Sequence, residues 1–249
     1  MHQNFSSQLR HAARLTSARF PLYVPLALLC LASLVLGLTS LDLKISSYFY
    51  NSQLKQWPLS DKNPWEFIDQ WCVLPGFILG VSSLLLSNYG LLWRRSNHWT
   101  RGAFLIATVF LIGPGLLVNG TMKPAFSRPR PREVIQMGGE QAYQPAFGFG
   151  EKMNFNASFP SGHASIGFFL IAPAFLFRRK HRTRRLILIS GLLLGSVMSL
   201  SRIVQGGHYL SDVLWSLAII YFTSWITLTL MLTHELKQSK NGHLNKEDA

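Results

Sequence analysis

Four long stretches of this 249-residue chain contain no charged residue. A helix needs about 20 consecutive apolar residues to cross the ~30 Å hydrocarbon core of a bilayer. Each stretch is at least 21 residues long, so each predicts a membrane-spanning helix. The four stretches are residues 20–41, 71–93, 102–122 and 213–233.

Two shorter apolar runs complete the predicted membrane domain. Residues 164–177 and 186–201 reach spanning length if their helices include His163 and Arg202, respectively. Because lipid offers the backbone no hydrogen-bond partner, a spanning segment must satisfy its own polar groups. The sequence therefore predicts an all-α bundle of six transmembrane helices. The expected divisions are a mobile, basic N-terminal segment, 1–19, the six-span domain, 20–233, and a polar tail, 234–249.

Cysteine is scarce, and the first apolar stretch lacks a signal-peptide cleavage site. Cys30 and Cys72 lie within apolar runs, where a thiol usually packs as a small hydrophobic group, so they indicate nothing about redox compartment. The run at 20–41 is longer than the apolar core of a signal peptide, which has about 7–15 residues. We therefore expect an uncleaved first helix.

Acidic residues are few as well, 11 against 24 Lys and Arg, which gives a net charge of +13. Such a charge would suit nucleic acid, but the positions of the cations indicate a membrane instead. With six spans and a cytoplasmic N-terminus, fifteen of the 24 cations fall on the cytoplasmic side. Positively charged loops stay in the cytoplasm, so we expect both termini there and no nucleic-acid partner. The basic run at 178–185 is interpreted as a topology anchor that contacts anionic lipid.

One loop on the expected external side is nevertheless cationic. It joins the third and fourth predicted spans, and Arg202 lies at the outer end of the fifth. External cations oppose the orientation rule, so they need another explanation, and binding of an anion supplies one. The cations of this loop are Lys123, Arg128, Arg130, Arg132 and Lys152.

The last predicted span begins with a pattern typical of phosphate chemistry. His208 and Asp212 are four residues apart, so they share one face of a helix. An Asp that accepts a hydrogen bond from one imidazole nitrogen leaves the other nitrogen free to attack. A His/Asp pair at this spacing, taken alone, more often forms a hydrogen bond that only stabilises the structure. Arg202, whose planar guanidinium holds two phosphate oxygens at once, favours the functional interpretation.

A second motif, Pro160-Ser161-Gly162-His163, opens the fourth predicted span. A helix N-terminus presents free N–H groups and partial positive charge, and Gly162 lets an anion approach the backbone closely. The Ser161 hydroxyl either caps the helix or donates to phosphate. His163 lies at the mouth of this helix, in position to protonate a leaving oxygen.

A third motif places Lys123 directly after the third span and Arg130 seven residues later. Three prolines between residues 124 and 131 prevent a regular helix, so we expect a stiff loop that holds cations in fixed positions. The roles of Arg128, Arg132 and the rest of the loop, 133–158, stay open. One interpretation of both arginines is that their side chains extend to lipid headgroups, as such side chains commonly do.

Together the three motifs resemble the signature of the type 2 phosphatidic acid phosphatase family. They read Lys123-x6-Arg130-Pro131, Pro160-Ser161-Gly162-His163 and Ser201-Arg202-x5-His208-x3-Asp212, and their order and spacings match at every position. The resemblance implies a metal-independent phosphatase without a cofactor. It also implies that His208 is the nucleophile, forming a phosphohistidine, that Asp212 orients it and that His163 is the general acid. The residues implied to hold the phosphate are Lys123, Arg130, Ser161, Gly162 and Arg202.

An outward-facing site in a membrane protein predicts a lipid phosphate or diphosphate substrate that enters sideways from the outer half of the bilayer. We expect a bacterial inner membrane and a periplasmic site. Candidate substrates are undecaprenyl diphosphate, the 1-phosphate of lipid A and phosphatidylglycerol phosphate, and the loop at 128–159 loosely resembles the lipid A 1-phosphatase branch. One alternative is phosphate transfer to a second lipid. Another is a non-enzymatic transporter, although transporters typically carry ionisable or broken-helix features at mid-membrane depth.

Overall fold

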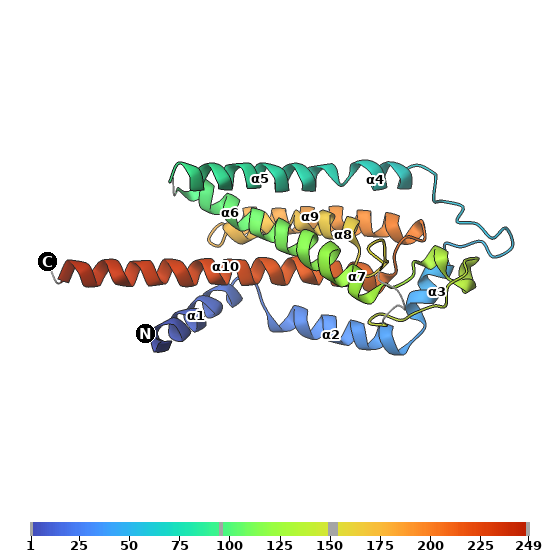
Figure 1. The fold of residues 1–249 in the computed structure, drawn as a ribbon, viewed down its shortest axis with the longest axis horizontal. Helices are drawn as coiled ribbons and strands as arrows, with labels where there is room; N and C mark the ends of the chain where they lie inside the picture. The colour runs from blue at the N-terminus through green and yellow to red at the C-terminus, as the bar shows by residue number, and fades with distance from the viewer. Residues whose placement is uncertain (1, 95–96, 149–153, 248–249) are drawn as a thin grey trace.

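A computed structural model describes residues 2–94, 97–148 and 154–247, and within these ranges every named element is helical (Figure 1). This confirms the expected all-α membrane bundle. The α-helices are α1 (His2–Ser17), α2 (Tyr23–Leu38), α3 (Leu41–Ser47), α4 (Trp65–Trp71), α5 (Leu74–Leu92), α6 (His98–Phe110), α7 (Lys123–Phe126), α8 (Gly162–Phe169), α9 (His181–Val204) and α10 (Leu210–Glu247). The other helical elements are a π-helix, η1 (Leu111–Met122), and three 3-10 helices, η2 (Pro131–Glu133), η3 (Ile135–Met137) and η4 (Ala172–Leu176).

Six membrane spans are not confirmed. In the described part of the chain, four helical stretches are long and apolar enough to cross a bilayer. The pair α2 and α3, bent by 77° at its break, makes a fifth if it is counted as one span. The four stretches are Trp65–Leu92, His98–Glu133, His181–Val204 and Leu210–Lys240.

The segment that was expected to form the fourth span is a broken helix. Its α-helical part, α8, ends at Phe169, and the 3-10 helix η4 follows. Pro173 explains this break, because its ring clashes with the carbonyl four residues earlier in a continuous helix, here that of Phe169. The segment is largely buried, with Ala164, Phe168 and Phe169 inside the apolar core. It therefore serves as a short internal helix that presents its N-terminus to one end of the bundle.

The N-terminal segment is ordered, so the expectation of a mobile start is wrong. Helix α1 lies beside α10 in Figure 1, and its Ala12 and Thr16 are fully buried. The Thr229 hydroxyl donates to the Thr16 hydroxyl at 3.1 Å. Packing against the long last helix therefore orders this segment, although its polar sequence did not predict a fixed structure.

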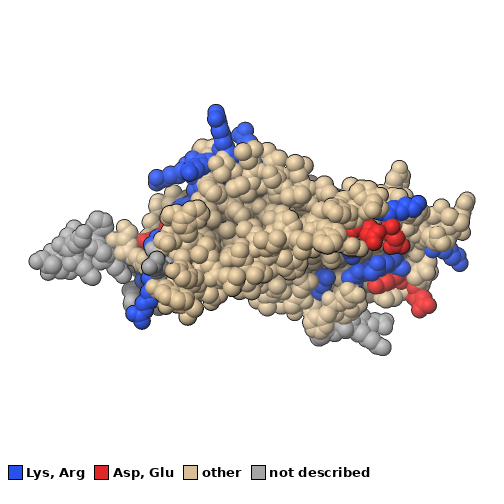
Figure 2. Space-filling view, turned by 90° about the horizontal axis from the view of Figure 1, so that it is seen from above, with Lys and Arg blue, Asp and Glu red and all other residues tan. Residues whose placement is uncertain are grey.

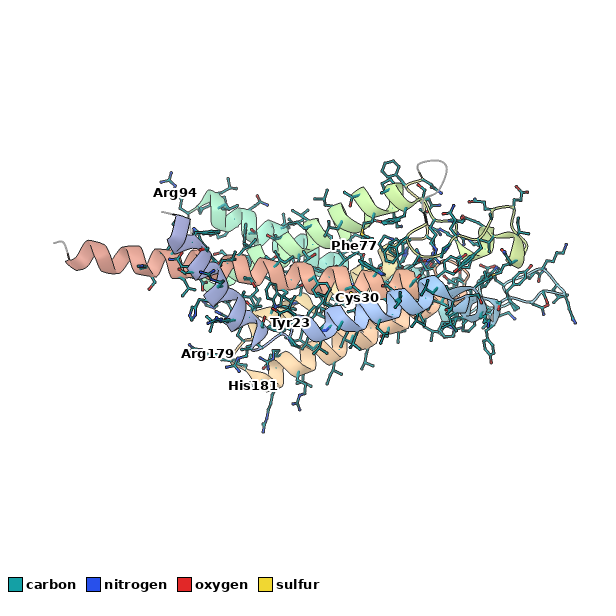
Figure 3. All side chains as sticks on the ribbon, turned by 90° about the horizontal axis from the view of Figure 1, so that it is seen from below. Tyr23, Cys30, Phe77, Arg94, Arg179 and His181 are labelled. Carbon is teal, nitrogen blue, oxygen red and sulfur yellow. The ribbon has the colours of Figure 1, made fainter. Side chains whose placement is uncertain are left out.

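Charged side chains gather at the two ends of the molecule. Figure 2 shows Lys, Arg, Asp and Glu at both ends, with a largely uncharged band between them. Figure 3 places Arg94, Arg179 and His181 at the end that holds both chain termini. This distribution fits the expected cytoplasmic end, although the orientation itself stays a prediction. Lys152 of the cationic loop and Arg95, one of the fifteen cations expected on the cytoplasmic side, lie outside the described residues.

A buried arginine joins three distant segments at the other end of the bundle. Arg128 is 0% exposed and donates to Asp212 of α10 at 2.6 Å and to Asp42 of α3 at 3.0 Å. It also donates to the Ser211 hydroxyl at 2.7 Å, and its guanidinium lies 4.0 Å from the ring centre of Tyr209. The suggestion that Arg128 extends to lipid headgroups is therefore wrong.

Selective labelling tests the orientation. In a chain with Cys30→Ser and Cys72→Ser, an impermeant maleimide should label Ser52→Cys in intact spheroplasts, because the positive-inside rule puts that segment outside. Arg182→Cys, within the basic run, should be labelled only after lysis. The opposite pattern would show that the bundle is inverted.

Replacing the buried arginine should weaken the fold strongly. Arg128→Met leaves two buried carboxylates without their cation, so we expect a loss of about 3–5 kcal/mol in the free energy of unfolding. Denaturant unfolding in detergent, followed by tryptophan fluorescence, measures it. The matched control is Arg132→Met, four residues later and exposed, which should change little. Equal stability of the two variants would contradict the structural role of Arg128.

Candidate active site

All eight predicted site residues lie in the described part of the chain, at the end of the bundle remote from the termini. Hydrogen bonds bring the three motifs together. The Ser161 N–H donates to the Asp212 carbonyl at 3.3 Å, which joins the second motif to the third, and the Arg128 guanidinium donates to the Asp212 carboxylate at 2.6 Å, which joins the first to the third. The site therefore combines the α7 region, the N-terminus of α8, the end of α9 and the start of α10.

His208 is held as a neutral imidazole with one nitrogen free. Its Nδ1 lies 2.7 Å from the main-chain carbonyl of Ser158 and 3.5 Å from a carboxylate oxygen of Asp212. Both neighbours are acceptors, so the proton belongs on Nδ1 and the lone pair on Nε2. Burial lowers the pKa of His208 to about 3, against the opposing effect of Asp212. The free Nε2 is thus unprotonated at neutral pH.

Ser158 was missed by the sequence analysis, and it connects the two members of the His/Asp pair. Its carbonyl accepts from His208, while its hydroxyl donates to Asp212 Oδ2. The same Asp212 oxygen accepts from the Tyr209 N–H at 2.8 Å. The nearest acceptor to His208 is therefore a backbone carbonyl, and Asp212 acts as a fixed negative charge nearby. The Ser158 carbonyl carries no side-chain signal that a sequence would display.

The N-terminus of α8 is built as predicted, and Ser161 is its cap. The Ser161 hydroxyl accepts from the Ala164 N–H at 3.3 Å, which leaves its own hydrogen available to donate. At Gly162 an added Cβ would lie 3.0 Å from Asn119 Oδ1 and 3.4 Å from the Lys123 ammonium nitrogen. Lys123 therefore reaches the start of this helix, where a glycine leaves room for it.

Arg130 is fixed by the loop that follows it. Its Nε donates to the Asn156 carbonyl at 3.1 Å and its Nη2 to the Asn156 side-chain oxygen at 2.6 Å. The Arg130 N–H donates to Glu133 at 2.8 Å. These contacts hold the guanidinium in one position, as the expectation of a stiff cationic loop requires.

Arg202 is held along one edge only. Its Nη1 donates to Asp69 at 2.6 Å and to the Gln205 side chain at 3.0 Å. Its Nε is buried and has no hydrogen-bond partner among the described residues. The Nε edge of a guanidinium is one that grips two oxygens of an oxyanion. Arg202 thus has an open donor for a bound anion.

Asp69 of α4 is the second residue that the sequence analysis missed. Besides its pairing with Arg202, it lies 3.6 Å from Nε2 of His163. The side chain of His163 is 41% exposed, whereas that of His208 is 1% exposed, so His163 is the histidine that meets water. Partial burial, and then Arg202, lower the pKa of His163 to about 4, while Asp69 acts in the opposite direction.

Comparison with known proteins identifies the same family. A model of the PAP2 superfamily matches residues 102–235. The lipid A 4'-phosphatase of Francisella tularensis subsp. novicida (strain U112) is 31% identical over 195 residues, 77% of this chain and 86% of that relative. The lipid A 4'-phosphatase of Rhizobium leguminosarum is 34% identical over 128 residues, 50% of this chain and 54% of that relative. A transmembrane PAP2 type phosphatidylglycerolphosphate phosphatase from Bacillus subtilis matches with 18% identity and a TM-score of 0.46, over 87% of this chain and 98% of that chain.

The matched region contains every residue of the three motifs, from Lys123 to Asp212. It also covers more than half of the chain, and the first relative matches most of its own length. These matches favour an enzyme over the transporter alternative. The chain therefore belongs to the PAP2 superfamily and is a membrane lipid phosphatase.

Proposed function

We propose that this chain removes the 4'-phosphate of a lipid A molecule at the periplasmic face of a bacterial inner membrane, through a phosphohistidine on His208. The observation that carries the mechanism is the fixed imidazole of His208, whose Nε2 is free and unprotonated. The substrate is favoured by the two relatives described as lipid A 4'-phosphatases. Their names favour the 4' position over lipid A 1-phosphate, undecaprenyl diphosphate and phosphatidylglycerol phosphate.

In the first step, Nε2 of His208 attacks phosphorus and the bond from phosphorus to the lipid oxygen breaks. His163 gives its proton to that leaving oxygen. The phosphorylated ring keeps its proton on Nδ1 and becomes positively charged, and Asp212 at 3.5 Å offsets this charge. The free energy of the transition state is lowered by Lys123 and the two arginines Arg130 and Arg202, which offset charge on the phosphoryl oxygens. These cations supply the positive charge without a metal ion.

In the second step, water attacks the phosphohistidine. His163, now neutral, takes a proton from the water as the bond from phosphorus to Nε2 breaks. Phosphate leaves, and His208 returns to its neutral form with the proton still on Nδ1. The 41% exposure of His163 allows water to reach it for this step.

The low pKa of His163 fits a proton donor that is charged only with substrate present. In the empty site, partial burial and Arg202 disfavour its protonated form. A phosphate dianion bound beside Arg202 adds negative charge, which favours the protonated imidazole. Substrate binding therefore raises the fraction of His163 that is ready to donate.

Replacing His208 tests the nucleophile. His208→Ala should lower phosphate release from lipid A by at least about a thousandfold, because the covalent route is lost. Radiolabelled substrate provides the second measurement. In the enzyme with both histidines intact, rapid quenching during turnover should trap a protein-bound phosphate that is labile to acid and stable to alkali. In His208→Ala no such label should form, and label in that variant would refute the assignment.

Replacing Asp69 tests the proton donor through its pH dependence. The decline of kcat/KM at rising pH reports the loss of the proton from His163 in the free enzyme. Asp69→Asn removes the negative charge that favours protonated His163, so this decline should move to lower pH. The position of the decline is the readout, because the variant also loosens Arg202 and lowers the maximal rate. A decline that stays in place or moves to higher pH would contradict the role of Asp69.

A further inference from the structure

A polar cavity of about 630 Å³ opens beside the proposed phosphate site. This volume falls within the roughly 300–1,000 Å³ that is usual for small-ligand sites. Its walls come from the segment between α3 and α4, from α4, from η2 and from the end of α9. The lining residues are Lys55, Gln56, Trp57, Ser60, Asp61, Glu66, Asp69, Gln70, Arg132, Arg202 and Gln205.

The cavity is continuous with the reaction site and fixed to it. Arg202 and Asp69 belong to both. The ring of Trp57 packs against Gly206, where an added Cβ would lie 2.5 Å from it, and the Arg132 N–H donates to the Gly206 carbonyl at 3.1 Å. Gly206 is two residues before His208. The cavity walls are therefore anchored to the loop that positions the nucleophile.

The charges of the lining residues are balanced. Lys55, Arg132 and Arg202 face three carboxylates, those of Asp61, Glu66 and Asp69. A second phosphate group in this cavity would meet these carboxylates, whose like charge opposes it. The balance favours a group that is neutral overall and rich in hydrogen-bond donors and acceptors.

The remaining lining residues also suit a neutral polar group. Gln56, Ser60 and Gln70 offer amide and hydroxyl groups, which both donate and accept. The indole N–H of Trp57 is buried and has no hydrogen-bond partner in the described part of the chain. A buried donor without a partner costs free energy, and a bound hydroxyl would satisfy it. An acyl chain would leave these groups unpaired.

We propose that this cavity binds a sugar ring attached to the scissile phosphate, so that substrate choice depends on hydrogen bonds that the sugar donates to Asp61 and Glu66 and accepts from Trp57. This rests on the proposed function for the position of the phosphate at Arg202. A sugar supplies neutral hydroxyls that donate to the carboxylates and accept from the indole. The substrate class is then a phosphorylated glycolipid rather than a glycerolipid phosphate.

Binding measured in the inactive His208→Ala enzyme tests the cavity without turnover. The two ligands are lipid A with a 4'-phosphate and phosphatidic acid with matched acyl chains, each titrated in detergent micelles. Loss of one hydrogen bond to a neutral hydroxyl should weaken binding of lipid A roughly three- to tenfold. We therefore expect Asp61→Asn and Glu66→Gln each to lower the preference for lipid A over phosphatidic acid by that factor.

Glu140→Gln is the matched control, because Glu140 is an exposed carboxylate outside the cavity lining. It should leave the preference unchanged. An unchanged preference in both cavity variants, or equal weakening for the two ligands, would overturn the sugar site. Failure of the proposed function would give a different result. The enzyme with His208 intact would then release no phosphate from lipid A, while the binding preference persisted.

Discussion

The buried ion pair between Arg128 and Asp212 connects the fold to the site. A buried charge costs several kcal/mol unless it is paired and hydrogen-bonded, and Asp212 is fully buried. Arg128 compensates it and also binds Asp42, so α3, the long loop and α10 assemble around one guanidinium. The same carboxylate lies beside His208 and accepts from Ser158, which orients that ring. His208, the proposed nucleophile, is therefore oriented only when these three segments have come together.

Concentrated positive charge is the second constraint on this site. Burial lowers the pKa of both histidines, and Arg202 contributes in the same direction for each. In the empty site, the cations repel one another and any protonated imidazole. A bound phosphate reverses this situation, because its negative charge lies where the positive potential is highest. The arrangement thus favours an anion before any bond changes, and it does so with groups that the protein already holds in fixed positions.

The sequence predicted arrangements that follow from local spacing and missed contacts between residues that are far apart in the chain. His208 and Asp212 share one helix turn, and Ser161 is adjacent to the start of α8, so their positions follow from short-range pattern. Arg128 pairs across 84 residues with Asp212, and Arg202 across 133 with Asp69, so no local pattern announces these contacts. Long apolar runs likewise predicted helices but not the break before Pro173 or the 77° bend after α2. The length of an apolar segment indicates whether it can cross a membrane, whereas tertiary packing determines where its helix bends or breaks.

The site end of the molecule therefore divides recognition between two kinds of surface. In the proposed mechanism Lys123, Arg130 and Arg202 attract phosphate by charge, and any phosphorylated lipid supplies that charge. The adjoining cavity is balanced in charge and rich in hydrogen-bonding groups. We propose that it selects among lipids because a lipid without hydroxyls would leave those groups without hydrogen-bond partners. A site built to hydrogen-bond a hydroxyl rejects an analogue without it more strongly than an apolar pocket rejects a missing methylene. If this proposal holds, selectivity among lipid phosphates belongs to α4 and the segment before it, outside the three motifs that are proposed to carry the chemistry.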